Sequence, residues 1–156
     1  MKKVVIGIVV AILILVAVYF IMPENMKLML DYYRIQTFDK ETFAEIQVVQ
    51  NTKVLNQDTY TYGEIFDSVV GHQYWTYEDN ITTTGAYQKI ITANGDNVTL
   101  TLGDSGDGGV YENSKIQFVF TLDSKGGYDL ATYMDGNLMS KDMRNALLER
   151  MCSMTK

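Results

Sequence analysis

An unbroken apolar block near the N-terminus constrains this chain more than any other feature. From Val4 to Met22, 18 of 19 residues are apolar, and the exception is Gly7. At about 1.5 Å per helical residue the block would be roughly 28 Å long, close to the ~30 Å thickness of the hydrocarbon core of a bilayer. The sequence therefore predicts a single transmembrane helix, which makes residues 1–22 a membrane anchor with the lipid bilayer as its partner.

A cleavable signal peptide is the alternative, and it would also begin with basic residues such as Lys2 and Lys3. Signal peptides have a shorter apolar core, of ~7–15 residues, before a cleavage site made of small residues. Here the bulky residues Tyr19 to Met22 precede Pro23, which favours a retained anchor. The basic residues before the block predict a cytoplasmic N-terminus and an extracytoplasmic C-terminal domain at the cell membrane.

The remainder of the chain is acidic. The whole sequence has 13 Lys and Arg residues against 19 Asp and Glu residues, and without Lys2 and Lys3 the balance is 11 minus 19, or −8. This charge excludes nucleic acid as a partner. The single cysteine permits no internal disulfide, and the length allows one domain rather than a two-domain enzyme.

Residues 23–41 are predicted to form a helical stalk next to the membrane. Pro23 suits a first helical turn, because its missing N–H would have no partner there. Apolar side chains follow at helical spacing, namely Met26, Met29, Leu30 and Tyr33. This stripe either lies on lipid head groups or on the domain, or it is a self-association surface between copies of the chain.

Residues 42–156 are predicted to form the extracytoplasmic domain. Residues 43–49 are typical of a strand. Thr61 and Glu64 fit a capping box at the start of a short helix, and Ser140 is expected to cap a C-terminal helix.

Two hairpins are expected between these helices. The Asn94-Gly95 pair supplies the positive φ of a tight turn between residues 87–93 and 98–102, and residues 123–127 connect a second pair of strands. The domain is therefore predicted to be α+β, with a mostly antiparallel sheet and two short helices packed on one face.

Few residues suggest chemistry. His72 is the sole histidine and follows Gly71, which is expected to end the first helix of the domain, while Cys152 is predicted to lie in the terminal helix. Asp104 to Gly109 lacks the oxygen donors of an EF-hand loop, although weak Ca²⁺ binding there stays open. The sequence predicts no catalytic residue, no cofactor and no metal ligand, and so a protein that is not an enzyme.

An aromatic group is the remaining candidate site. Tyr74, Trp75 and Tyr77 occur together in a predicted strand. Such residues either form an exposed interaction surface or belong to the core and rim of a small sheet domain.

Several segments form a pattern within residues 44–151, namely Tyr60 to Asp67, Trp75, Ile116 to Phe120, the Met134 to Gly136 turn and the helix with Leu147 and Leu148. Together they resemble a small domain of uncharacterised bacterial membrane-anchored proteins. In those proteins a T-x-GEAF-D segment precedes a tryptophan strand and an IQF strand. Ile65 replaces the alanine, and the glycine-rich residues 103–109 are an insertion. The resemblance implies an α+β module without known catalytic residues, and it names no ligand.

The first 23 residues also resemble a class III or archaeal-type prepilin, because a short basic leader ends in Gly7 before an apolar stretch. The acidic residue expected five positions after the glycine is replaced by Ile12. Two functions are therefore expected: a membrane-anchored module that binds a protein or cell-envelope partner, or a pilin-like filament subunit that is cut after Gly7 and assembled through its N-terminal helix.

Overall fold

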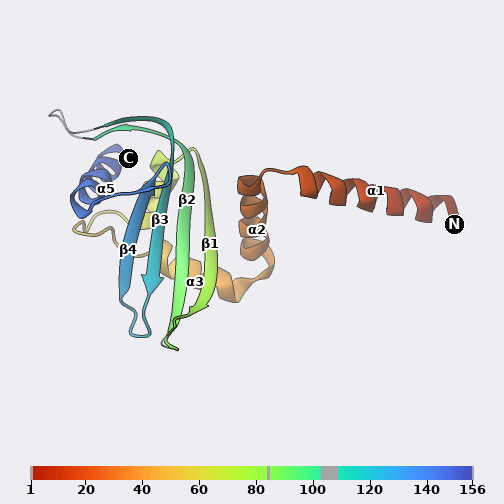
Figure 1. Cartoon of the computed structure of the whole chain (residues 1–156), viewed down its shortest axis with the longest axis horizontal. Coiled ribbons are helices and arrows are strands. Elements are labelled where there is room, and N and C mark those ends of the chain that lie inside the picture. The colour runs from red at the N-terminus through yellow and green to blue at the C-terminus, as the bar shows by residue number, and fades with distance from the viewer. Residues whose placement is uncertain (1, 84, 103–108, 156) are drawn as a thin grey trace.

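The computed structural model is an α+β domain with one helix pointing away from it (Figure 1). It describes residues 2–83, 85–102 and 109–155, and the side chains of the first helix from Gly7 onward. The helices are α1 (Lys2–Ile21), α2 (Glu24–Phe38), α3 (Lys40–Gln50), α4 (Tyr62–Val69) and α5 (Lys141–Met154). The strands are β1 (His72–Ile81), β2 (Tyr87–Thr101), β3 (Val110–Leu122), β4 (Tyr128–Met134) and β5 (Asn137–Leu138).

The strands form one antiparallel sheet in the order β1-β2-β3-β4-β5. One face of the sheet carries the core, with the fully buried side chains of Trp75, Ile91, Phe118 and Phe120. Helix α4 packs on this face, and the ring centroid of Phe66 lies 5.0 Å from that of Phe118 and 5.5 Å from that of Trp75. Helix α5 adds Leu147, Leu148 and Met151 to the same core.

The helix starts and the second hairpin that the sequence predicts are confirmed. The Thr61 hydroxyl accepts a hydrogen bond from the Glu64 N–H at 3.3 Å, and the Glu64 carboxylate accepts one from the Thr61 N–H at 2.7 Å. The Ser140 hydroxyl accepts from the Met143 N–H at 3.3 Å. Strands β3 and β4 pair across residues 123–127. Local hydrogen bonding therefore determines these elements.

The predicted strand at residues 43–49 is wrong, because this segment belongs to helix α3. Asp39 caps the helix by accepting a hydrogen bond from the Thr42 N–H at 3.2 Å. Ile46 and Val49 are buried and Phe43 packs against the core. Residues three positions apart lie on the same face of a helix, so the spacing of these side chains is typical of a helix packed on a core.

The predicted hairpin at Asn94-Gly95 is also wrong, because β2 continues through this pair. Gly95 lies opposite Gln73 of β1. The positive φ occurs further along, at Asn97 with φ 60°, where the pairing with β3 shifts register between Gly95 and Val98. The segment is therefore a β-bulge, which turns the strand without ending it.

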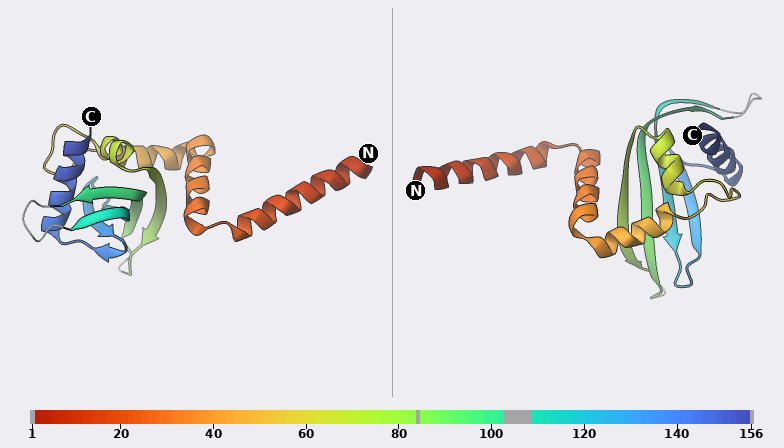
Figure 2. Two further views of the ribbon diagram at one scale, coloured as in Figure 1. Left: turned by 90° about the horizontal axis from the view of Figure 1, so that it is seen from above. Right: turned by 180° about the vertical axis from the view of Figure 1, so that it is seen from behind.

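The predicted fold class is wrong in the number of helices and in the transmembrane helix. It placed a helical stalk and two short helices behind a transmembrane helix, whereas the described residues form four helices after α1, of which α3 is the unexpected one. The helix predicted within residues 23–41 is present as α2, whose Tyr32 and Ile35 are buried and which lies beside the edge strand β1 (Figure 2). The α+β class and the antiparallel sheet agree with the sequence-based expectation.

The predicted membrane anchor at Val4 to Met22 is not supported. Among the described residues, no helix is long and apolar enough to cross a membrane. The predicted single-pass topology and the extracytoplasmic location of the domain depended on this anchor, and they are therefore not supported either.

Candidate functional site

A groove opens between the N-terminal end of α2, the start of β1, the bulged part of β2 and β3, and the turn between β4 and β5. It consists of two adjoining cavities of about 560 and 340 Å³, and both are lined by Asp96 and Lys115. Five carboxamide side chains line it beside apolar ones, namely Asn25, Asn94, Asn97, Asn113 and Gln117. We call this feature the amide groove.

Hydrogen bonds hold several of these side chains in place. The Gln117 amide donates to Asn94 Oδ1 at 2.8 Å, which fixes the pair across β2 and β3. The Asn25 amide lies 3.4 Å from Asp96 Oδ2 and connects α2 to the bulge. Asn97 Nδ2 lies 3.1 Å from His72 Nδ1. The wall of the groove is therefore organised by contacts between elements far apart in the sequence.

The backbone is unusual around the amide groove. Four non-glycine residues in the described part of the chain have positive φ, and three of them line this groove: Asn97 at 60°, Asn113 at 52° and Asp135 at 51°. Asparagine and aspartate tolerate this conformation better than most residues, but it still costs free energy. Backbone of this kind gathers at ligand sites more often than elsewhere.

The groove does not contain the arrangement of a nucleophile and a base. His72 is exposed, and its ring nitrogen lies against the Asn97 amide rather than a hydroxyl, thiol or carboxylate. Within residues 2–83, 85–102 and 109–155, no three His, Cys, Asp or Glu side chains gather as metal ligands. The amide, carboxylate and ammonium groups of the groove can form hydrogen bonds to a ligand.

The three predicted aromatic residues are separated by the structure. Trp75 is 1% exposed and lies in the core. Tyr74 points from the opposite face of β1 and lines the amide groove. Tyr77 takes part in a polar cluster near the far end of β1. These residues therefore do not form one exposed interaction surface.

The predicted stripe on α2 remains largely accessible. Met26 and Leu30 are each 48% exposed and Tyr33 is 56% exposed, whereas Met29 is half-buried against the core. The opposite side of the helix is buried through Tyr32 and Ile35. Self-association through this stripe stays a prediction.

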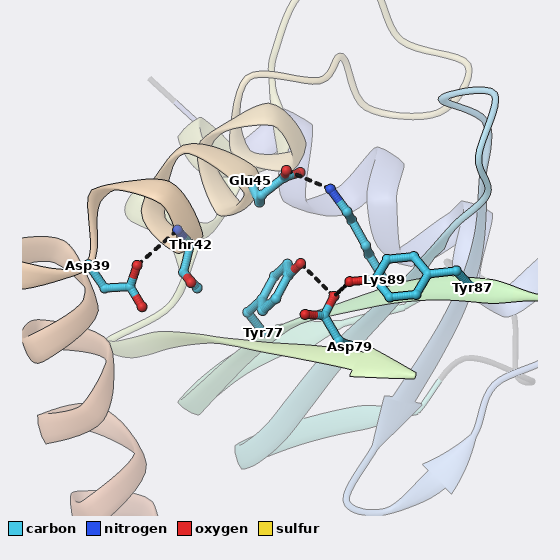
Figure 3. A network of polar contacts seen from close by, with 7 residues as sticks. All are labelled: Asp39, Thr42, Glu45, Tyr77, Asp79, Tyr87 and Lys89. Atoms are coloured by element: carbon cyan, nitrogen blue, oxygen red, sulfur yellow. Dashed lines mark hydrogen bonds and ion pairs between the residues drawn. The ribbon is translucent and has the colours of Figure 1, made fainter. Parts of the chain in front are cut away.

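A second polar cluster lies between α3 and the other end of β1 and β2 (Figure 3). The Tyr77 hydroxyl donates to Asp79 Oδ1 at 2.7 Å, and the Tyr87 hydroxyl donates to the same oxygen. Lys89 of β2 forms an ion pair with Glu45 of α3, with 2.5 Å between the charged atoms. The cluster thus connects β1 to β2 and fastens α3 to the sheet.

The charges in this cluster are stabilised in their usual ionised forms. The two tyrosine hydroxyls, Tyr87 first and then Tyr77, lower the pKa of Asp79 by donating to its carboxylate. The hydrogen bond to Glu45 raises the pKa of Lys89. Burial, followed by the contact with Asp79, raises the pKa of Tyr77. Shifts in these directions favour a structural contact over acid–base catalysis near neutral pH.

Two sequence candidates carry no site. Cys152 is buried in α5, and burial raises the pKa of its thiol, which disfavours the reactive thiolate. The Asp104 to Gly109 loop, for which Ca²⁺ binding stayed open, lies outside the described residues except for Gly109.

The most extensive apolar surface is that of α1. Its large side chains between Ile8 and Ile21 are all exposed, reaching 75% for Phe20 and 82% for Ile21. They occupy every side of the helix, which extends away from the domain in each view (Figures 1 and 2). Lys27 of α2 lies over the Tyr19 ring at 5.3 Å from its centroid, so the contact between the two helices is small.

Comparisons with protein-family models, curated proteins and solved structures find no match for this chain. The resemblances to the domain of membrane-anchored proteins and to prepilins therefore stay predictions. Sequence reasoning missed the amide groove, because its residues come from α2 and three strands. The sequence signal that could have indicated it is the presence of Asn94, Asn97 and Asn113 in neighbouring strands.

Proposed function

We propose that this chain is a non-enzymatic interaction module whose copies associate through α1 and present the α+β domain to a protein partner. The observation that carries the proposal is the continuous apolar surface of α1, exposed on all sides between Ile8 and Ile21. Monomeric proteins in water rarely expose apolar patches larger than a few hundred Å². A surface of this kind is therefore expected to be buried against another molecule.

The apolar side chains surround α1 instead of forming one stripe. A helix that is apolar all round is usually buried on all sides. A single flat surface would bury one side of α1, whereas in an assembly of several α1 helices each copy buries every side that faces a neighbouring copy. The domain does not supply the cover, because its own core is already closed by α3, α4 and α5. These points support a bundle of α1 helices.

Sedimentation velocity of the full chain tests this proposal. We expect oligomers for the natural sequence and a shift towards monomer for Leu13→Glu combined with Val16→Glu, because a charge in an apolar bundle is costly unless it is paired. The matched control is Val48→Glu with Leu138→Glu, which changes two exposed apolar residues of the domain and should leave the oligomer intact. A natural chain that sediments as a monomer would contradict self-association.

The pilin-like subunit is the second candidate. The specific observation is that a chain cut after Gly7 would keep the large apolar side chains of α1 between Ile8 and Ile21, all of which are exposed. N-terminal sequencing of the protein from its natural host distinguishes the two candidates. Ile8 as the first residue supports filament assembly after processing, while Met1 or Lys2 excludes processing and leaves the unprocessed module.

A further inference from the structure

The amide groove has properties that the proposed self-association does not use. We infer that it is a binding site for a neutral oligosaccharide. The inference rests on the groove itself: two joined cavities of about 560 and 340 Å³, carboxamide side chains along their walls, and an apolar patch on one side. It concerns the domain alone and does not depend on α1.

The carboxamides match the hydrogen-bonding capacity of sugars. An asparagine or glutamine side chain offers both a donor and an acceptor, and a sugar hydroxyl likewise donates and accepts. The hydrogen bond between Gln117 and Asn94 uses one N–H of Gln117 and leaves its carbonyl oxygen for a ligand. Asn97 similarly uses only its amide nitrogen towards His72.

The charges in the groove favour an uncharged ligand. Asp96 and Asp135 oppose Lys115, so an anion such as a phosphate would meet two carboxylates. The Asp135 carboxylate already accepts from the Lys115 N–H at 2.8 Å. Because the described residues hold no cluster of three metal-ligating side chains, a bound cation is not favoured either.

The apolar part of the groove matches the other surface of a sugar ring. Met26 and Met29 line the first cavity and Tyr74 lines the second. The C–H groups of a pyranose can pack against such side chains while its hydroxyls bond to the amides. Ligand sites typically combine apolar contacts with a few placed polar groups.

The bulge explains how the strands produce this arrangement. Asn97 of β2 and Asn113 of β3 both line the groove and both have positive φ. They lie where the pairing of β2 with β3 shifts register. Bulges beside binding sites commonly redirect side chains in this way. The fold therefore maintains costly backbone conformations where the carboxamides converge.

The test is saturation-transfer NMR and isothermal titration of the full chain. The probes are a panel of neutral oligosaccharides built from glucose, galactose, mannose and N-acetylhexosamine units. We expect at least one probe to bind with a Kd below about 1 mM. Gln117→Ala and Asn25→Ala should each weaken this binding at least about tenfold, which corresponds to ~1.4 kcal/mol.

Matched controls keep the result interpretable. Asn80→Ala changes an exposed amide on β1 and Gln47→Ala an exposed amide on α3, both outside the groove; binding should stay within about twofold of the natural chain. Near-UV circular dichroism establishes that each variant is folded. Absence of binding across the whole panel, binding unaffected by both groove substitutions, or binding of peptides but of no saccharide would each overturn the inference.

Discussion

Gly95 of β2 lies directly against Val70, the residue that follows α4. A Cβ placed on this residue would lie 2.3 Å from Val70 Cγ1 and 3.1 Å from Ile116 Cγ2. Since Gly95 is not among the residues with positive φ, the requirement is for space and not for a turn. The Asn-Gly pair that predicted a hairpin therefore serves packing.

We predict that Gly95→Ala destabilises the domain by about 1–3 kcal/mol, because overpacking a closed core displaces neighbouring atoms. Chemical denaturation measures the change. The control is Gly71→Ala, whose Cβ would meet its nearest atom at an ordinary 3.7 Å. Equal stability of the two variants would show that Val70 moves aside without cost.

Asp79 gives the domain a pH dependence with a defined sign. Hydrogen bonds from Tyr87 and Tyr77 lower its pKa in the folded state. A lowered folded pKa stabilises the fold above the unfolded value of about 3.9, and this contribution is lost as the pH falls through the folded pKa. We expect Asp79→Asn to reduce the fall in melting temperature on acidification.

Thermal unfolding between about pH 6 and pH 2 measures this effect. Asp58→Asn is the control, because Asp58 is exposed and no hydrogen bond to its carboxylate is seen among the described residues. If both variants show the pH dependence of the natural chain, the two tyrosine contacts do not stabilise the folded state.

At the scale of elements, the start of α4 is held by a complete capping box. We predict that Thr61→Ala lowers stability by about 1 kcal/mol, since it leaves the Glu64 N–H without its partner. Ser68→Ala in the same helix is the control, because Ser68 is exposed and alanine favours helices. Denaturation curves of the two variants should differ, and equal curves would contradict the role of the cap.

The elements also show where sequence reasoning succeeds. The Thr61 cap, the Ser140 cap and the β3–β4 hairpin depend on neighbours in the sequence, and all were predictable. Residues 43–49 were not, because Val48 and Val49 favour strands in isolation while packing of Ile46 and Val49 on the domain stabilises a helix. Tertiary contacts override the local preference here.

The candidate sites were also not predictable from local sequence, because they depend on tertiary contacts. The sequence allowed Trp75 to lie either in the core or on the surface. In the structure Trp75 pairs with the buried Ala93 of β2 and lies on the core face of the sheet. The amide groove joins Asn25 to Asp96 across 71 positions of sequence. Neither composition nor periodicity indicates a contact at that separation, so the groove required the three-dimensional structure.

At the scale of the whole molecule, a closed α+β domain carries a helix whose apolar surface is open. The domain is stabilised by its own core, and α1 shares with it the contact between Lys27 and Tyr19. This division of the chain supports one role for the domain in recognition and another for α1 in assembly. Oligomer formation should therefore depend on α1 and leave the folded domain unchanged.

Disulfide cross-linking between copies tests the central claim most directly. In a Cys152→Ser background, the account predicts that Leu13→Cys forms covalent dimers on mild oxidation and resists a water-soluble maleimide before it. Lys141→Cys on the exposed start of α5 should react with the maleimide and remain monomeric. Free labelling of Leu13→Cys with no covalent dimer would contradict assembly through α1.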